Sequence, residues 1–120
     1  MEIARDVLLV LHFVGLASLL GGFLLQMREP VKVVNAAMLH GALTQLVTGV
    51  GLVWVLTRLH EQDPAQWGEP DNAKYGVKAT ILLAILVLVW VNRRRESVPT
   101  GVWALIGLLT LSDIVVAVVW

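Results

Sequence analysis

The ionisable side chains within long apolar segments of this 120-residue chain include His12, Lys78 and Asp113. A neutral imidazole is a good ligand for haem iron or copper, an ammonium group can pair with an anion, and a carboxyl group can hold a cation or a proton. Because charge is costly within hydrocarbon, each group needs a partner, a route to the membrane surface or a function. These residues are therefore the first candidates for a site.

The segments that carry these residues have the length and composition of membrane spans. The chain is 58% apolar and 15% charged, whereas soluble domains average about 45–50% and about 25%. Between Ala79 and Val91 the only polar side chain is the weakly polar Thr80, so this segment lacks the polar stripe of a solvent-exposed helix. Since about 20 apolar residues cross a bilayer, the sequence predicts an all-α integral membrane four-helix bundle. We expect a single transmembrane domain, residues 1–120, with spans at about 7–27, 33–57, 75–92 and 101–120.

Charge and cysteine content exclude several other classes of protein. Nine basic and nine acidic residues give a formal net charge of zero, so no basic surface indicates nucleic acid as a partner. The chain has no cysteine, which excludes disulfides and thiolate metal sites. The partner that the composition does predict is the lipid bilayer.

The distribution of basic residues predicts the orientation in the membrane. The first and third loops share one side of a four-span bundle, whereas the second loop, residues 58–74, is acidic and lies on the other side. By the positive-inside rule we expect a protein integral to the cytoplasmic membrane, with both termini and the acidic loop outside the cytoplasm. The basic residues on the expected inner side are Arg28, Lys32, Arg93, Arg94 and Arg95.

Depth along the spans separates the polar residues into two groups. With a rise of about 1.5 Å per residue, His12, Lys78 and Asp113 all lie in the outer half of the bundle. His40 enters from the inner side and lies roughly 10–15 Å away along the axis. His40 and Gln45 are therefore second-rank candidates for the site.

Structural roles account for the same residues. Lys78 can extend its ammonium group to the surface, Asp113 can form an ion pair with Lys78 or stay protonated and bonded to a neighbour, and His12 can be a hydrogen-bonded packing residue. His60, in the second loop, is expected to be solvated. Hydrogen bonds between helices are the expected role of the polar residues in the second span, Thr44, Gln45 and Thr48.

Three segments resemble the membrane domains of copper-resistance protein D (CopD). LHFVGLASLLGG, which contains His12, resembles their first-helix pattern LHxxxxxxxxGG, and Thr48-Gly49 resembles the TG of their second helix. YGVKATILLAILVLVWVNRRR is similar to their YGxxLxxKxxLxxxxxxLxxxNRxR helix, matching at Tyr75, Gly76, Lys78 and Asn92-Arg93. The HemJ-type protoporphyrinogen oxidases share a first-helix histidine and a third-helix lysine, which are implicated there in binding b-type haem. The resemblance covers the first three spans and implies that His12 and Lys78 bind a cofactor.

Residues and resemblance together predict a small membrane protein that holds b-type haem or a metal ion in the outer half of the bundle, for redox chemistry or for haem or metal handling. His12 would ligate haem iron or copper, and Lys78 would be a second axial ligand when deprotonated or would pair with a haem propionate. Copper has less support, because Met27 and Met38 lie at the inner side. Two alternatives stay open: a non-enzymatic membrane subunit or assembly partner whose polar residues are structural, and a small ion-coupled transporter with Asp113 as the carrier group.

Small residues on the first span predict self-association. Ala17-xxx-Gly21 and Ser18-xxx-Gly22 have the spacing that lets two helices approach closely in lipid. We therefore expect a homodimer or a place in a larger membrane complex.

Overall fold

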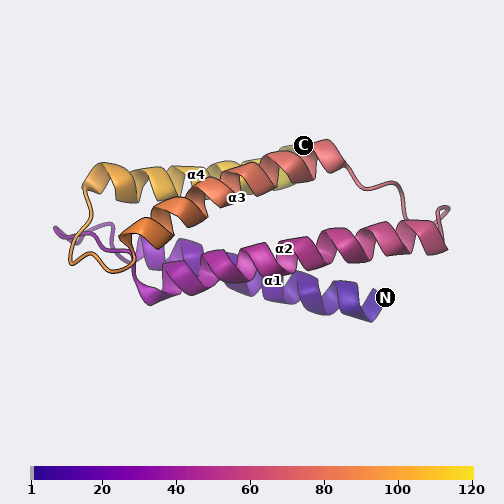
Figure 1. Ribbon diagram of the computed structural model, residues 1–120, viewed down its shortest axis with the longest axis horizontal. Coiled ribbons are helices and arrows are strands. Elements are labelled where there is room, and N and C mark those ends of the chain that lie inside the picture. The colour runs from indigo at the N-terminus through magenta and orange to yellow at the C-terminus, as the bar shows by residue number, and fades with distance from the viewer. Residues whose placement is uncertain (1) are drawn as a thin grey trace.

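A computed structural model describes residues 2–120, and within them the chain forms four long helices and no β-strand (Figure 1). All four helices are long and apolar enough to cross a membrane, and the whole measures 53 × 23 × 22 Å. The predicted all-α, four-helix membrane bundle is therefore confirmed. The helices are α1 (Glu2–Leu24), α2 (Ala36–Gln62), α3 (Asn72–Asn92) and α4 (Thr100–Val119).

The helices whose ends differ most from the predicted spans are α1, which lies earlier than residues 7–27, and α2, which lies later than residues 33–57. Helix α2 begins later because Asn35 is its N-cap, and the side-chain oxygen of Asn35 accepts the backbone N–H of Met38 at 3.0 Å. It continues to Gln62, just before Asp63 and Pro64, because a helix need not stop where the hydrocarbon ends. The second loop is correspondingly shorter than predicted, since α3 begins at Asn72.

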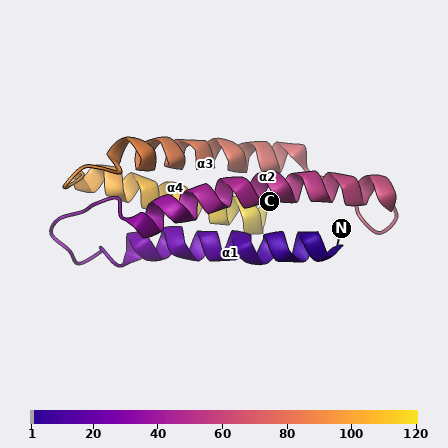
Figure 2. The same cartoon turned by 60° about the horizontal axis from the view of Figure 1, so that its bottom comes forward.

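The four helices form two hairpins. Figures 1 and 2 show α1 lying along α2 and α3 lying along α4, and these are the two most extensive helix contacts. Glycines allow α1 and α2 to approach closely: a Cβ atom at Gly41 would lie 2.4 Å from the backbone nitrogen of Leu19 and 2.6 Å from the carbonyl oxygen of Gly15. This contact fixes the rotation of both helices, and so decides which side chains face the bundle interior.

Part of the small-residue pattern predicted for dimerisation is used inside the chain. Ser18 donates a hydrogen bond to the carbonyl oxygen of Ala37 at 2.7 Å, and a Cβ atom at Gly22 would meet the side chain of Asn35 at 2.7 Å. Ser18 and Gly22 therefore pack α1 against α2. Gly21, by contrast, has no other part of the chain within 4 Å of a Cβ atom at that position.

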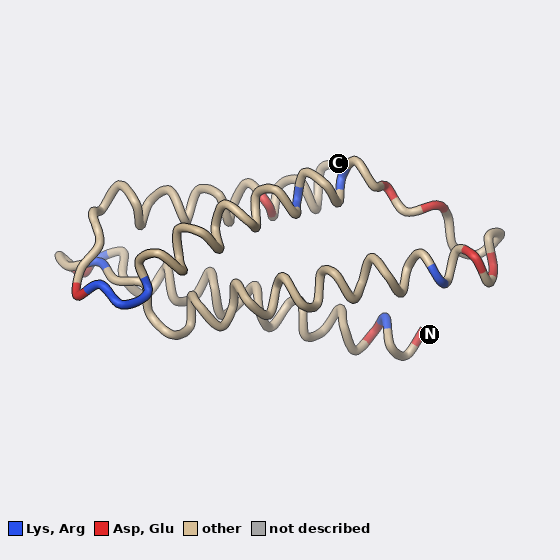
Figure 3. Tube along the Cα trace, in the orientation of Figure 1, with Lys and Arg blue, Asp and Glu red and all other residues tan. Residues whose placement is uncertain are grey.

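The two basic loops meet at one end of the bundle, and the acidic second loop lies at the other (Figure 3). We call these ends inner and outer after the orientation that the sequence predicts. The backbone N–H of Val98 donates to the carbonyl of Lys32 at 2.8 Å, which joins the first loop to the third. This contact places both loops on one side, as the sequence predicts.

Lys32 is buried rather than exposed, which the sequence did not predict. Its ammonium group donates to the carbonyl oxygens of Gln26, Met27 and Glu29 and lies 4.4 Å from the centre of the Trp103 ring. These carbonyls belong to the loop that follows Leu24, so this lysine holds the first loop together just after the end of α1.

The main apolar core lies in the inner half of the bundle. Phe23 stacks on Trp103 with ring centres 4.3 Å apart, and the Phe23 ring fills the space above Gly107. Side chains from all four helices join this core. Those that are almost fully buried are Leu19, Met38, Ile85, Val89 and Ile106. The inner half is therefore closed, whereas the two hairpins separate toward the outer end (Figure 1).

Candidate functional site

Two adjoining cavities lie between the hairpins in the outer half. The smaller, of about 240 Å³, is bounded mainly by α1, α3 and α4, and the larger, of about 540 Å³, by α1, α2 and α3. The same four polar side chains line both cavities, one from each helix: His12, Gln45, Lys78 and Asp113. We call these residues the polar cluster. The structure thus brings together the three first candidates, His12, Lys78 and Asp113. It adds Gln45, which the sequence had given as a second-rank candidate.

His12 is held by α2 through one ring nitrogen. Its Nδ1 lies 2.7 Å from the hydroxyl oxygen of Thr48, and a Cβ atom at Gly49 would lie 3.6 Å from its Cε1 atom, an ordinary contact. Among residues 2–120, the Nε2 atom of His12 has no hydrogen-bond partner. One nitrogen is therefore engaged in the structure, and the other is free to meet a ligand.

Gln45 bonds across helices, as predicted. Its Nε2 donates to the backbone carbonyl of His12, and Thr48 lies one turn further along the same face of α2. The sequence identified Thr48 only as a residue that bonds between helices and as part of the Thr48-Gly49 motif, not as the partner of His12. The signal that could have found it is its spacing of three residues from Gln45 within an otherwise apolar helix.

Lys78 and Asp113 face the cavities without touching each other. In the part of the chain that the structure describes, the ion pairs within 4.0 Å are Arg5–Asp6 and Arg58–Glu61, both at the outer end. A direct Lys78–Asp113 ion pair, one of the structural alternatives, is therefore not formed. Asp113 instead has a buried carboxyl oxygen, Oδ1, with no hydrogen-bond partner. Such an atom is costly unless a proton, a cation or a donor group meets it.

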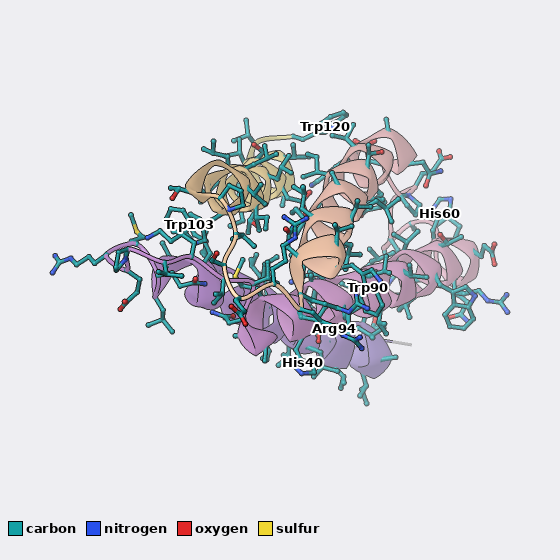
Figure 4. All side chains as sticks on the ribbon, turned by 60° about the vertical axis from the view of Figure 1, so that its left-hand side comes forward. His40, His60, Trp90, Arg94, Trp103 and Trp120 are labelled. Atoms are coloured by element: carbon teal, nitrogen blue, oxygen red, sulfur yellow. The ribbon has the colours of Figure 1, made fainter. Side chains whose placement is uncertain are left out.

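The other two histidines lie outside this site. His40 is exposed, and Figure 4 shows it on the side of the bundle that faces away from α3 and α4. The rotation of α2 turns it away from the cavities, so the structure does not place this second-rank candidate with His12. His60 is not simply solvated, because its Nδ1 lies 2.9 Å from the carbonyl oxygen of Trp67 in the second loop.

Haem would need fewer donor atoms from this site than copper would. No three His, Asp or Glu side chains in residues 2–120 gather into a metal-binding group, and Met38 is fully buried in the inner half. Copper bound within one chain would thus have His12 as its only imidazole ligand. Haem iron is already held by four macrocycle nitrogens and needs only one or two axial ligands from the protein.

Comparisons with protein-family models, with curated proteins and with solved structures find no match for this chain. The resemblance to the CopD and HemJ families therefore stays a prediction. Fold and site define a class: an integral membrane four-helix bundle that is closed at its basic end and holds a polar cluster in cavities near the other end.

Proposed function

We propose that this chain binds b-type haem between its two hairpins, in the outer half of the bundle, with His12 as an axial ligand. The observation that carries the proposal is the convergence of one polar side chain from each helix on cavities whose other walls are mostly aliphatic. Binding pockets of about 300–1,000 Å³ typically combine apolar walls with a few placed polar groups. Bound haem would supply one-electron redox chemistry.

Lys78 is proposed to pair with a haem propionate. Lys78 lines both cavities together with His12, and Arg5, Asn72 and Tyr75 also line the larger one. An apolar macrocycle between aliphatic walls with its anionic groups toward cationic side chains keeps each part of the ligand in a suitable environment. Axial ligation by Lys78 remains the alternative role for this residue.

The decisive measurement is the visible spectrum of the protein purified in detergent after expression with haem supplied. We expect a Soret band that is lost in His12→Ala and kept in His40→Ala, a matched control because His40 faces outward. Absence of a Soret band both after expression and after reconstitution with haem would exclude the proposal.

A membrane subunit or assembly partner is the second proposal, favoured by the use of Ser18, Gln45 and Thr48 in contacts between α1 and α2. The double variant His12→Ala, Lys78→Met discriminates the two. A structural role predicts lower stability without loss of a cofactor, whereas a ligand role predicts loss of haem. Copper binding would appear as bound metal in the purified wild-type protein that is lost in the same variant.

An ion-coupled transporter is a weaker proposal. The unpartnered oxygen of Asp113 favours it, but the apolar core that closes the inner half gives no polar path across the bundle. Ion flux into proteoliposomes that disappears in Asp113→Asn would support transport, and flux that survives this change would remove Asp113 as the carrier.

We further propose that the protein lies in the cytoplasmic membrane with the basic loops inside and the haem site toward the outer surface. The clustering of basic side chains at one end supports this orientation (Figure 3). A homodimer through the Ala17–Gly21 face, which Ser18 and Gly22 do not share, is proposed on the small-residue spacing. Crosslinking in native membranes that yields only monomer would count against the homodimer.

A further inference from the structure

We infer that Thr48 is a positioning residue for His12: its hydroxyl group fixes the imidazole in the tautomer with the proton on Nδ1 and leaves Nε2 as an unprotonated acceptor. The tautomer follows from the hydrogen bonds alone. The consequence for a ligand rests on the proposed haem site.

This inference rests on which atoms around the Thr48 hydroxyl group can donate a proton to a hydrogen bond. A threonine hydroxyl has one proton to donate and two lone pairs. The Thr48 oxygen lies 2.6 Å from the backbone carbonyl oxygen of Thr44, which has no proton and can only accept. The carbonyl oxygen of Gln45, at 3.4 Å, is a more distant second acceptor. The hydroxyl proton is therefore committed to the backbone of α2.

His12 must then be the donor in its contact with Thr48. Its Nδ1 lies 2.7 Å from the hydroxyl oxygen, and a bond of this length needs one proton between the two atoms. Because Thr48 has none left, the proton belongs to Nδ1. A neutral imidazole carries one ring proton, so Nε2 holds a lone pair.

The packing of α1 on α2 makes this hydrogen bond a fixed feature. Gln45 holds the backbone carbonyl of His12, so α2 contacts His12 at both its main chain and its ring. The close approach at Gly15 and Gly41 sets the distance between the helices. A histidine held in this way loses little rotamer freedom when its other nitrogen binds a ligand.

The Nε2 lone pair is the atom that haem iron would use. Histidines that ligate metals commonly donate their other N–H to a protein oxygen, which fixes the tautomer and orients the ring. Here the acceptor is a neutral hydroxyl rather than a carboxylate. Thr48 therefore acts through His12 and does not touch the ligand.

The tautomer can be tested without any cofactor. We would label histidine with ¹⁵N in protein that carries His40→Gln and His60→Gln, so that His12 is the only histidine, and record NMR spectra at about pH 8, above the ordinary histidine pKa of about 6.5. We expect a protonated Nδ1 and a bare Nε2 in this protein and in Thr48→Ser. In Thr48→Val the Nε2–H tautomer should become populated.

Thr57→Val is the matched control, because Thr57 also donates to the carbonyl four residues before it, at 2.8 Å, but forms no hydrogen bond with a histidine. It should leave the His12 signals unchanged. A wild-type spectrum with the proton on Nε2, or an unchanged tautomer in Thr48→Val, would overturn the inference. Should Thr48→Val fail to fold, the spectra of the wild type and Thr48→Ser decide the tautomer by themselves.

Titration of the purified protein with haem tests the positioning role of Thr48 in ligand binding. Loss of an orienting partner typically weakens metal binding about 10–100-fold, so we expect weaker haem binding in Thr48→Val and recovery in Thr48→Ser. Equal haem affinity in wild type and Thr48→Val would remove the positioning role and leave the tautomer assignment intact. Absence of haem binding in the wild type would instead remove the proposed function.

Discussion

Single side chains in this protein differ in whether their polar atoms are satisfied. Lys32 and Asp113 are opposite cases: the ammonium group of Lys32 contacts three carbonyl oxygens, whereas Oδ1 of Asp113 contacts no polar partner. A buried polar group with hydrogen-bond partners stabilises the fold, whereas one without partners destabilises it. A functional role can explain why such a destabilising group is present. The two residues therefore give opposite predictions on substitution.

Replacing Lys32 with methionine should destabilise the protein. Only 6% of the surface of Lys32 is exposed, and the substitution removes its hydrogen bonds to the carbonyl oxygens of Gln26, Met27 and Glu29, which costs about 1–3 kcal/mol. Denaturant unfolding in detergent would measure the change. Arg28→Met is the control, because Arg28 is an exposed cation of the same loop. Similar losses of stability in both variants would contradict the role of Lys32 in holding this loop together.

Replacing Asp113 with leucine should stabilise the protein in the absence of a ligand. The substitution removes a buried oxygen that has no partner, and satisfying or removing such a group is worth about 1–3 kcal/mol. We expect a higher midpoint of thermal unfolding for Asp113→Leu than for wild type, with little change for Ser112→Leu on the exposed side of α4. A clear loss of stability in Asp113→Leu would mean that this carboxyl group has a structural partner.

At the scale of helices, the contact between α1 and α2 positions the site. A Cβ atom at Gly41 would collide with backbone atoms of α1, which cannot move aside as a flexible side chain can, whereas one at Gly21 would meet nothing within 4 Å. The two glycines therefore form a matched pair for alanine substitution.

Gly41→Ala should destabilise the bundle by about 1–3 kcal/mol, the usual cost of overpacking. It should also move His12 away from Thr48, and so weaken any haem binding. Within a single chain, Gly21→Ala should be neutral or stabilising by up to about 1 kcal/mol, because alanine favours the helix over glycine. Thermal unfolding of both variants checks this prediction, which fails if Gly41→Ala is as stable as Gly21→Ala.

At the scale of the whole molecule, the bundle has a closed basic end and an open end near the acidic loop. Because the chain has no cysteine, single cysteines can report the orientation. Cysteines at Glu61 and Gln66, both exposed at the outer end, should react with an impermeant maleimide in intact cells. A cysteine at Ser97, exposed in the third loop, should react only after permeabilisation.

The opposite labelling pattern would indicate that the site faces the cytoplasm, and it would favour a role in handling cytosolic haem. Labelling of both ends in intact cells would indicate mixed orientation, as in a dual-topology dimer. Either result leaves the polar cluster intact, since its four members share one half of the bundle whichever way it faces.

The sequence by itself determined the number and type of the helices and the end at which the basic loops gather. Apolar length decides whether a segment can span the bilayer, and helix rise decides the depth of each residue. Both are properties of a single segment. For this reason the outer-half grouping of His12, Lys78 and Asp113 needed no knowledge of how the helices pack.

Only the tertiary structure decided which polar groups meet. Depth says nothing about the rotation of a helix around its axis, and that rotation is set by the glycine contacts between α1 and α2. The same rotation brings Gln45 and Thr48 to His12 and turns His40 outward. The burial of Lys32 and the separation of Lys78 from Asp113 also depend on contacts between segments far apart in the chain. The sequence around each of these side chains is compatible with several partners, so it could not decide among them.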